Sequence, residues 1–362
     1  MPKKVWFNGK TKTKGWGGNL ANVEKSLRQI YIPDPGKIFV QVDQSGAEAL
    51  IVAHLCRDGN YRALFKNGIK PHSYIAMHLF TDVWPKKMVE HRLIQSTSDF
   101  DIQELIECPI PQLKQHPFWR SLDSLIKKSD NWALTERYYY LGKQTEHSSN
   151  YDIKAPTFQM NILVKSGGKI VIDREQAERF LAIKHALYPE IKEDFHANVR
   201  RQAEATKILY NLLGHPYCIS AYDIRESDWK EYYAWIPQST VGEITNTAYH
   251  ELQALIEENK LAWDLLANTH DSYMCQCPIG EERECAQTMQ RFINRDLVSP
   301  FDGTQFQMKS EAVAGYNWAP YDEKKNPLGL KAIEWRITKS GKAIVQDYHL
   351  LTISFNGVIV IW

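Results

Sequence analysis

The sequence has no apolar run that approaches the roughly 20 residues needed to cross a lipid bilayer. Its first residues, MPKKVWFNGKTKTKGWGG, do not include the apolar segment of a secretory signal. The six cysteines among 362 residues lack the regular spacing of a disulfide framework. We therefore expect no membrane span, and we expect reduced thiols in a cytoplasmic protein.

An excess of charge is also missing, since the formal net charge is only +1. The charges are nevertheless unevenly distributed, because residues 1–23 contain five lysines and no acidic residue. Such a segment is either a solvated basic arm or an arm that contacts phosphates. We expect residues 1–18 to be irregular and to form this basic N-terminal arm.

The first informative motif is the stretch KIFVQVDQSGAEALIVAHL at residues 37–55. Apolar and polar residues alternate up to Asp43, which predicts a strand, and helical spacing follows from near Ser45. Asp43 would thus lie at a strand end beside a helix start, where carboxylates bind metals or phosphate-linked ligands. The alternative is that Ser45 and Glu48 form a capping box and that Asp43 merely helps to cap the helix.

A second acidic residue lies in LLANTHDSYMCQC, which reads as a strand, a tight turn and a strand with THDS at the tip. Asp271 in this turn is explained by turn chemistry alone or by metal binding. Two carboxylates at the ends of antiparallel strands repel each other, and divalent cations such as Mg²⁺ relieve the repulsion. Two such ions clamp both oxygens of an in-line phosphoryl displacement. Whether Asp43 and Asp271 meet stays open at this point.

A third pattern lies in the helix expected over residues 133–151. Lys143, His147 and Tyr151 follow one another at intervals of four, which places them on one helix face. A cation, an imidazole and a phenol in a row suit the phosphates, sugar and base of a nucleotide. A solvated helix face is the alternative.

The remaining elements predict an α+β fold. An amphipathic segment over residues 174–206 has a break at Pro189, a hairpin is expected around LLGHP, and a long helix over residues 240–258. Residues 81–135 contain several prolines and look like an inserted unit. These patterns favour a layout in which helices pack on an antiparallel sheet.

These motifs, in this order, resemble the polymerase half of the family A DNA polymerases, especially the phage members. VDQSGAEALIVAHL is similar to the first carboxylate motif of that family, and THDS is similar to the second. RYYYLGKQTEHSSNYD is similar to the motif of the fingers helix. Three further segments resemble the family and extend the match to roughly residues 15–320: GGNLANVEKSLRQIYIPDPG, WIPQSTVGEI and DGTQFQMKSEAVAGYNW.

The resemblance implies a right-hand fold with an antiparallel palm sheet and a mostly helical fingers subdomain. The thumb and the proofreading exonuclease of the family are expected to be absent, so a second chain that carries them is a candidate partner of a split enzyme. The domains implied are the arm (1–18), the first part of the palm (19–80), the fingers (81–210, including the insertion 81–135), the second part of the palm (211–320) and a C-terminal extension (321–362).

The resemblance also implies the catalytic centre. Asp43 and Asp271 would hold two Mg²⁺ ions, assisted by the backbone carbonyl of Gln44. Lys143 would lie on the triphosphate and stabilise charge on the leaving pyrophosphate.

Substrate contacts are implied in the same way. Glu48 would exclude a ribose 2′-hydroxyl, Tyr151 would stack at the templating position, and His147 would lie near the sugar. Nucleotide binding is thus expected at Gln44, Glu48, Arg137, Lys143, His147 and Tyr151, and contact with primer-template DNA at Asn19, Asn22, Gln238 and His270.

Several positions depart from the family pattern. Tyr139 stands where the family has the arginine of the fingers helix, and Arg137 nearby is its candidate replacement. His147 stands where the family usually has Phe or Tyr, and Asp152 stands where it has glycine. These departures leave the expected metal ligands intact and affect the grip on the nucleotide.

The function expected is therefore that of a DNA-directed DNA polymerase, a nucleotidyltransferase that uses deoxynucleoside triphosphates in phage DNA replication in the cytoplasm of a bacterial host. The main alternative is a non-catalytic or decayed subunit that binds primer-template DNA. A single-chain RNA polymerase is a further alternative, against which Glu48 argues, and a metal-dependent nuclease would leave the row of Lys143, His147 and Tyr151 unexplained.

Overall fold

The computed structural model describes residues 3–7, 10–14, 23, 25–333, 353–355 and 358–360. The chain forms two compact units, each with its own internal packing. The first unit comprises Met1–Ala47, Val241–Asp296 and Gln307–Trp362, and the second comprises Glu48–Thr240 and Leu297–Phe306. These divisions differ from the boundaries expected at residues 80 and 210, and the assignment of palm and fingers stays a prediction.

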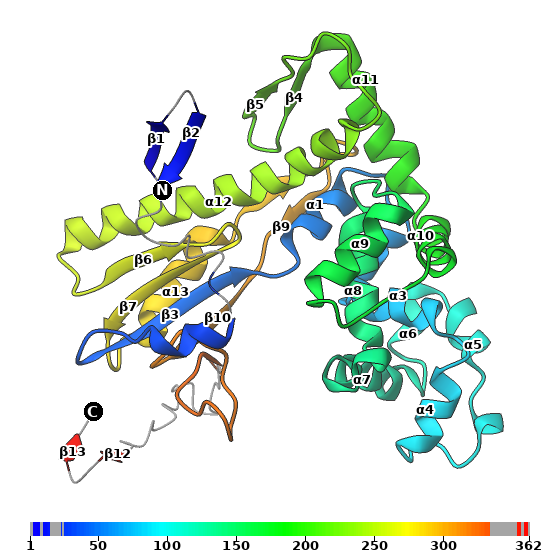
Figure 1. The fold of residues 1–362 in the computed structure, drawn as a ribbon, viewed down its shortest axis with the longest axis horizontal. Coiled ribbons are helices and arrows are strands. Elements are labelled where there is room, and N and C mark those ends of the chain that lie inside the picture. The colour runs from blue at the N-terminus through cyan, green and yellow to red at the C-terminus, as the bar shows by residue number, and fades with distance from the viewer. Residues whose placement is uncertain are drawn as a thin grey trace. The chain divides into compact units, whose positions relative to one another are not determined.

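A five-stranded antiparallel sheet is the centre of the first unit, with its strands in the order β11-β10-β3-β7-β6. Figure 1 labels four of them, β10, β3, β7 and β6. The strand predicted to end near Asp43 is confirmed as β3, and the predicted strand–turn–strand is confirmed as β6 and β7. The strands are β3 (Lys37–Gln44), β6 (Asp264–Asn268), β7 (Ser272–Pro278), β10 (Ser310–Gly315) and β11 (Lys331–Ala332).

The two central strands, β3 and β7, are largely buried. Helix α13 (Glu282–Ile293) packs on β3, β7 and β10 through an apolar face of Cys285, Met289 and Ile293 at helical spacing. A smaller cluster is formed by Phe39, Ala267, Met274 and Trp318, all of which are buried.

The second unit is mostly helical. Residues 81–135, which were expected to be an inserted unit, contain short helices, and their status as an insertion stays a prediction. The expected break at Pro189 lies between α10 and a π-helix. The helices are α2 (Asn60–Lys66), α3 (Pro71–Leu79), α4 (Trp84–Glu90), α5 (Ile102–Glu107), α6 (Ile110–Leu113), α7 (Trp119–Lys128), α8 (Tyr138–Ser149), α9 (Ala155–Lys165), α10 (Arg174–Leu187), the π-helix η6 (Ile191–His196) and α11 (Ala197–Thr206).

Two helices connect the units in sequence, α1 (Ala47–His54) and α12 (Trp229–Asn259). The long helix expected from residue 240 begins eleven residues earlier and contains Pro237 in its interior. An internal proline costs a helix about 3 kcal/mol. Burial of Trp229, Tyr233 and Ile236 around it outweighs that cost.

The remaining strands form small pairs. The hairpin expected around LLGHP is confirmed as β4 (Ile208–Tyr210) and β5 (Pro216–Cys218), and β8 (Asp296–Val298) pairs with β9 (Gln305–Gln307). The N-terminal arm was expected to be irregular, which is wrong for β1 (Lys3–Phe7) and β2 (Lys10–Lys14), since these pair with each other. In the C-terminal extension, β12 (Ile353–Phe355) pairs with β13 (Val358–Val360).

No helix in the described ranges combines the length and the apolar character that crossing a bilayer requires.

Candidate active site

Asp43 and Asp271 lie at the same end of the two central strands. In the antiparallel register of β3 and β7, Asp43 pairs with Ser272, the residue that follows Asp271. The backbone nitrogen of Gln44 donates to the backbone oxygen of Asp271 at 2.9 Å. The sequence left open whether the two acidic residues meet, and this pairing brings their backbones together.

The turn that carries Asp271 is held by its own hydrogen bonds. The backbone nitrogen of Thr269 donates to the Ser272 carbonyl at 2.8 Å, and that of Asp271 donates to the Thr269 carbonyl at 3.0 Å. The Thr269 and Ser272 hydroxyls lie 2.6 Å apart. His270 at the tip is exposed and has a φ of 74°, a left-handed conformation that non-glycine residues seldom adopt. The turn therefore fixes Asp271 and presents His270 to solvent.

Gln44 is buried, and its side chain is committed to α12. Its Nε2 donates to the Val241 carbonyl at 3.2 Å and to the Thr245 hydroxyl at 2.7 Å. The side chain therefore ties the end of β3 to the helix. Its backbone carbonyl remains the group that fits the metal role implied for this residue.

A third carboxylate at this end of the sheet was missed by the sequence reasoning. Glu311 on β10 pairs directly with Asp43 and is exposed. Directly paired residues of antiparallel strands point to the same face of the sheet. The segment SEAVAG alternates like a strand, but the register that brings Glu311 to Asp43 is not visible in the sequence.

The donor set at this sheet end fits Mg²⁺. Asp43 and Glu311 are exposed and Asp271 is partly exposed, so an ion could reach their carboxylate oxygens from solvent. Mg²⁺ prefers such hard oxygen ligands and retains several waters. No softer imidazole or thiolate ligand is needed to complete the set.

The row predicted on one helix face is only partly helical. Lys143 is exposed on α8, and His147 follows one turn later and is partly exposed. Helix α8 ends at Ser149, so Tyr151 lies beyond the helix rather than on its face. The prediction that the helix extends to residue 151 is therefore wrong, because Asn150 and the left-handed Asp152 end it.

Tyr151 instead meets another predicted residue, since its hydroxyl donates to the Glu48 carboxylate. Burial of the Tyr151 phenol raises its pKa, and the charge of Glu48 raises it further. The hydroxyl therefore remains a proton donor and Glu48 an acceptor. Glu48 and Tyr151 are far apart in the sequence, and the resemblance assigned both to nucleotide binding. The structure brings them into contact.

The C-terminal end of α8 is held by a buried polar network that sequence reasoning also missed. Asn150 donates from Nδ2 to Glu146 Oε1 at 2.8 Å and accepts at Oδ1 from Lys184 Nζ at 2.7 Å. His196 Nε2 lies 2.8 Å from the Asn150 carbonyl. Burial lowers the pKa of Lys184 to about 8 against the opposing charge of Glu146. This network fixes the backbone immediately before Tyr151.

For the other residues predicted to bind the nucleotide or the DNA, the described contacts do not indicate a role. Arg137 precedes the first residue of α8, and its buried Nε has no hydrogen-bond partner among the described residues. Gln238 is exposed on α12. Asn19 and Asn22 lie outside the described residues.

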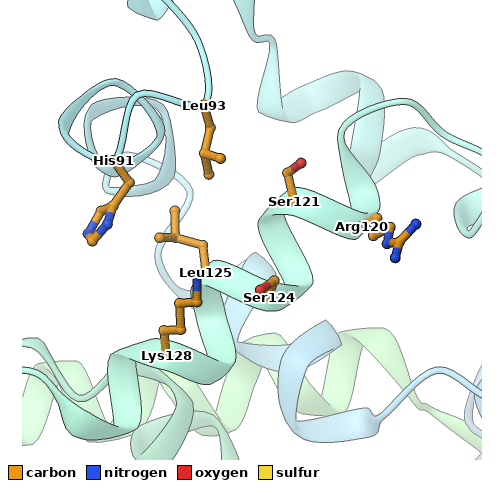
Figure 2. A pocket seen from close by; sticks show the side chains of 7 residues that line it. All are labelled: His91, Leu93, Arg120, Ser121, Ser124, Leu125 and Lys128. Atoms are coloured by element: carbon orange, nitrogen blue, oxygen red, sulfur yellow. The ribbon is translucent and has the colours of Figure 1, made fainter.

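A pocket of about 290 Å³ lies elsewhere in the second unit, between the turn after α4 and helix α7 (Figure 2). Basic and hydroxyl side chains line it together with two leucines, and none of its lining residues belongs to the predicted site: His91, Leu93, Arg120, Ser121, Ser124, Leu125 and Lys128. The pocket is therefore distinct from the residues assigned to the nucleotide.

Comparison with known proteins supports the polymerase resemblance. No protein-family model matches the chain. A curated relative, the DNA polymerase I of Caldicellulosiruptor bescii, is 29% identical over 99 residues, which cover 23% of this chain and 12% of the relative. The solved polymerase domain of Pol1 from M. smegmatis, in complex with DNA primer-template and dNTP, superposes with a TM-score of 0.55 at 16% identity and covers 83% of this chain.

The alignment with Pol1 covers 44% of that chain, so this protein spans less than half the length of either match. The mixed helical and antiparallel-sheet fold predicted from the sequence is confirmed as the fold of a polymerase domain. Both similar proteins are DNA polymerases, which confirms the resemblance to family A DNA polymerases.

Proposed function

We propose that the chain is a template-directed DNA polymerase that adds deoxynucleotides to the 3′ end of a primer. The pairing of β3 with β7 carries this proposal, because it brings Asp43 and Asp271 to one end of the sheet. The polymerase-domain fold adds support, since the similar Pol1 structure is a complex with primer-template and dNTP.

Asp43 and Asp271 would hold Mg²⁺ through their carboxylates, with the Gln44 carbonyl and Glu311 beside them. Two ions bound there would supply charge stabilisation to the primer 3′-oxygen that attacks the α-phosphate and to the oxygen that leaves with pyrophosphate. The chain itself contributes rigid placement of these ligands, because the turn hydrogen bonds and the Gln44 contacts to α12 fix the strand ends. Such positioning is a large part of catalysis of phosphoryl transfer.

The nucleotide would be bound by residues of the second unit. Lys143 offers an exposed ammonium group for the triphosphate, and Arg137 is the candidate for a second cation. The hydrogen-bonded pair of Glu48 and Tyr151 would form a wall against a ribose 2′-hydroxyl, with His147 facing the sugar. A pair held by a hydrogen bond is a stiffer barrier than either side chain alone.

Primer-template DNA would be contacted by Gln238, His270, Asn19 and Asn22. Gln238 and His270 are exposed and offer hydrogen-bond donors. The minor groove presents acceptors at nearly the same place in every base pair, so such donors check the shape of a pair without reading its sequence.

The setting proposed is phage DNA replication in the cytoplasm of a bacterial host. A second chain that carries a thumb and an exonuclease would then complete a split enzyme. The alternative, a non-catalytic primer-template-binding subunit, is favoured by the departures at Tyr139 and Asp152.

Single-nucleotide incorporation on four templates that differ only in the templating base tests the proposal. With Mg²⁺ at low salt, the wild-type chain should add the complementary deoxynucleotide to each primer. Asp43→Asn should bind the same DNA but lose incorporation, while Asp264→Asn, at the opposite end of the β6–β7 hairpin, should retain it. Primer-template binding without incorporation by the wild type would favour the non-catalytic subunit.

A further inference from the structure

Three potential metal ligands converge in the second unit, apart from the carboxylates of the first. His72 on α3 places its Nε2 3.4 Å from Oε2 of Glu146 on α8. His147, the next residue on α8, places its Nδ1 3.8 Å from the same oxygen. One ligand atom from each residue lies within 4.8 Å of the others. Two imidazoles and a carboxylate therefore face one small space.

A close approach of two helices creates this arrangement. A Cβ atom at Gly142 of α8 would lie only 2.6 Å from the backbone oxygen of His72. Glycine alone therefore lets α8 come this near to the first turn of α3. The side chains one turn further along α8, Glu146 and His147, are thereby brought opposite His72.

Glu146 is poorly explained without a cation. Its side chain is fully buried, and Oε1 accepts from the Tyr61 hydroxyl and from Asn150. Its Oε2 is also buried and makes no hydrogen bond within the described part of the chain. Burial of a carboxylate is unfavourable unless positive charge faces it, and a cation held between Oε2 and the two imidazoles would supply that charge.

We propose that His72, Glu146 and His147 bind a divalent transition-metal ion of the Zn²⁺ class. Two imidazole nitrogens and one carboxylate oxygen are a common three-ligand set for Zn²⁺, with a fourth position left to water or substrate. Mg²⁺ is disfavoured because it takes oxygen ligands almost exclusively.

The surroundings of the three residues support this assignment. The second ring nitrogen of His72, Nδ1, lies 3.3 Å from the Tyr139 hydroxyl. Metal-binding histidines are regularly oriented by such an outer hydrogen bond. The side chains of His72 and His147 are 19% and 40% exposed, so an ion can reach the site from solvent.

A metal here would have a consequence for the nucleotide, which rests on the proposed function. His147 lies one turn after Lys143, and it is the residue expected to face the sugar. Coordination would fix its imidazole ring in one orientation. Metal binding would then explain why a histidine stands at this position, where the family usually has Phe or Tyr.

Cobalt titration of the metal-free, full-length chain tests the proposal independently of polymerase activity. One Co²⁺ should bind with the visible absorption of a four-coordinate nitrogen and oxygen site, which is stronger than that of Co²⁺ in a six-coordinate oxygen site at Asp43 and Asp271, and Zn²⁺ should displace it. His72→Ala and His147→Ala should each weaken binding by more than about tenfold. These two side chains are partly exposed, so both variants should fold, which thermal unfolding would verify.

Matched controls separate this site from adventitious binding. His250→Ala removes an exposed histidine of α12 and should leave the affinity unchanged. Cys218→Ser removes the exposed thiol, whose involvement would appear as a sulfur-to-cobalt charge-transfer band. The proposal is overturned if the wild type does not bind Co²⁺, in which case the two imidazole rings face Glu146 without a metal. It is equally overturned if His72→Ala and His147→Ala bind as the wild type does. Either result leaves the proposed polymerase function untouched.

Discussion

At the scale of single residues, the contact between Glu48 and Tyr151 is the most informative part of the nucleotide site. The resemblance assigned them separate roles, exclusion of a ribose and stacking at the templating position. The hydrogen bond between them makes Tyr151 a support for Glu48, since the phenol stays protonated and holds the carboxylate in place. The two roles are therefore expected to depend on each other.

Substitution of Glu48 should relax the choice of sugar. Glu48→Ala opens space for a 2′-hydroxyl, and one small group in a pocket changes discrimination by about 10- to 200-fold. The ratio of deoxyribonucleotide to ribonucleotide incorporation should fall by about tenfold or more. Tyr151→Phe keeps the ring but removes the donor, so it should lower the ratio less. An unchanged ratio in Glu48→Ala would show that the carboxylate does not form the barrier.

His196 makes the stability of the protein dependent on pH. The ring is buried and stacks on Tyr233 with centroids 3.9 Å apart, and burial lowers its pKa from 6.5 to about 4. The unfolded chain therefore binds an additional proton between about pH 4 and 6.5. The free energy of unfolding should fall as the pH drops through this window, by on the order of 3 kcal/mol for this residue.

Denaturant unfolding from pH 7 to pH 4.5 measures that dependence. His196→Phe should reduce the slope of unfolding free energy against pH by about one proton. A slope remains, because burial also lowers the pKa values of His78 and His185, to about 4 and 3. The exposed His250→Phe serves as a control and should leave the slope as in the wild type. An equal slope in His196→Phe would mean that this ring is charged in the folded protein.

At the scale of elements, the contact of α3 with α8 depends on one glycine. Gly142→Ala would place a methyl group 2.6 Å from the His72 carbonyl, so one helix must move. Such overpacking costs about 1–3 kcal/mol. We expect a loss of that size in the free energy of unfolding measured with urea.

Gly242 provides the matched comparison, because it also lies inside a helix. A Cβ there would have only ordinary contacts, at 3.7 Å from His270 Nδ1. Gly242→Ala should be neutral or stabilise the protein by about 0.5–1 kcal/mol, since alanine favours helices. Equal effects of the two substitutions would contradict the close approach at Gly142.

The sequence predicted those elements whose signals are local. Alternation before Asp43, the THDS turn and the break at Pro189 each depend on a few neighbouring residues, and the structure contains all three. It did not predict where α12 begins, because tertiary burial outweighs the internal Pro237. The end of α8 before Tyr151 was likewise missed, because a network that reaches Lys184 and His196 fixes it.

At the scale of the whole molecule, the residues predicted for catalysis and for nucleotide binding fall into two groups. The carboxylates of the expected metal site and Gln44 belong to the first unit, and the other residues expected to bind the nucleotide belong to the second. Motif order alone predicted both groups. Contacts that depend on strand register, such as Glu311 opposite Asp43, could not be read from the sequence.

The most direct experiment is primer extension on a recessed template by the purified chain and by its Asp271→Ala variant. The assay contains Mg²⁺ and all four deoxynucleotides at low salt, because phosphate contacts weaken steeply as salt rises. Asp264→Ala, at the other end of the same hairpin, controls for general effects on the sheet. The wild type and Asp264→Ala should extend the primer, and Asp271→Ala should not. Extension by Asp271→Ala at the wild-type rate would contradict a catalytic centre at this sheet end. If the folded, DNA-bound wild type does not extend the primer, polymerase activity of the chain alone is contradicted.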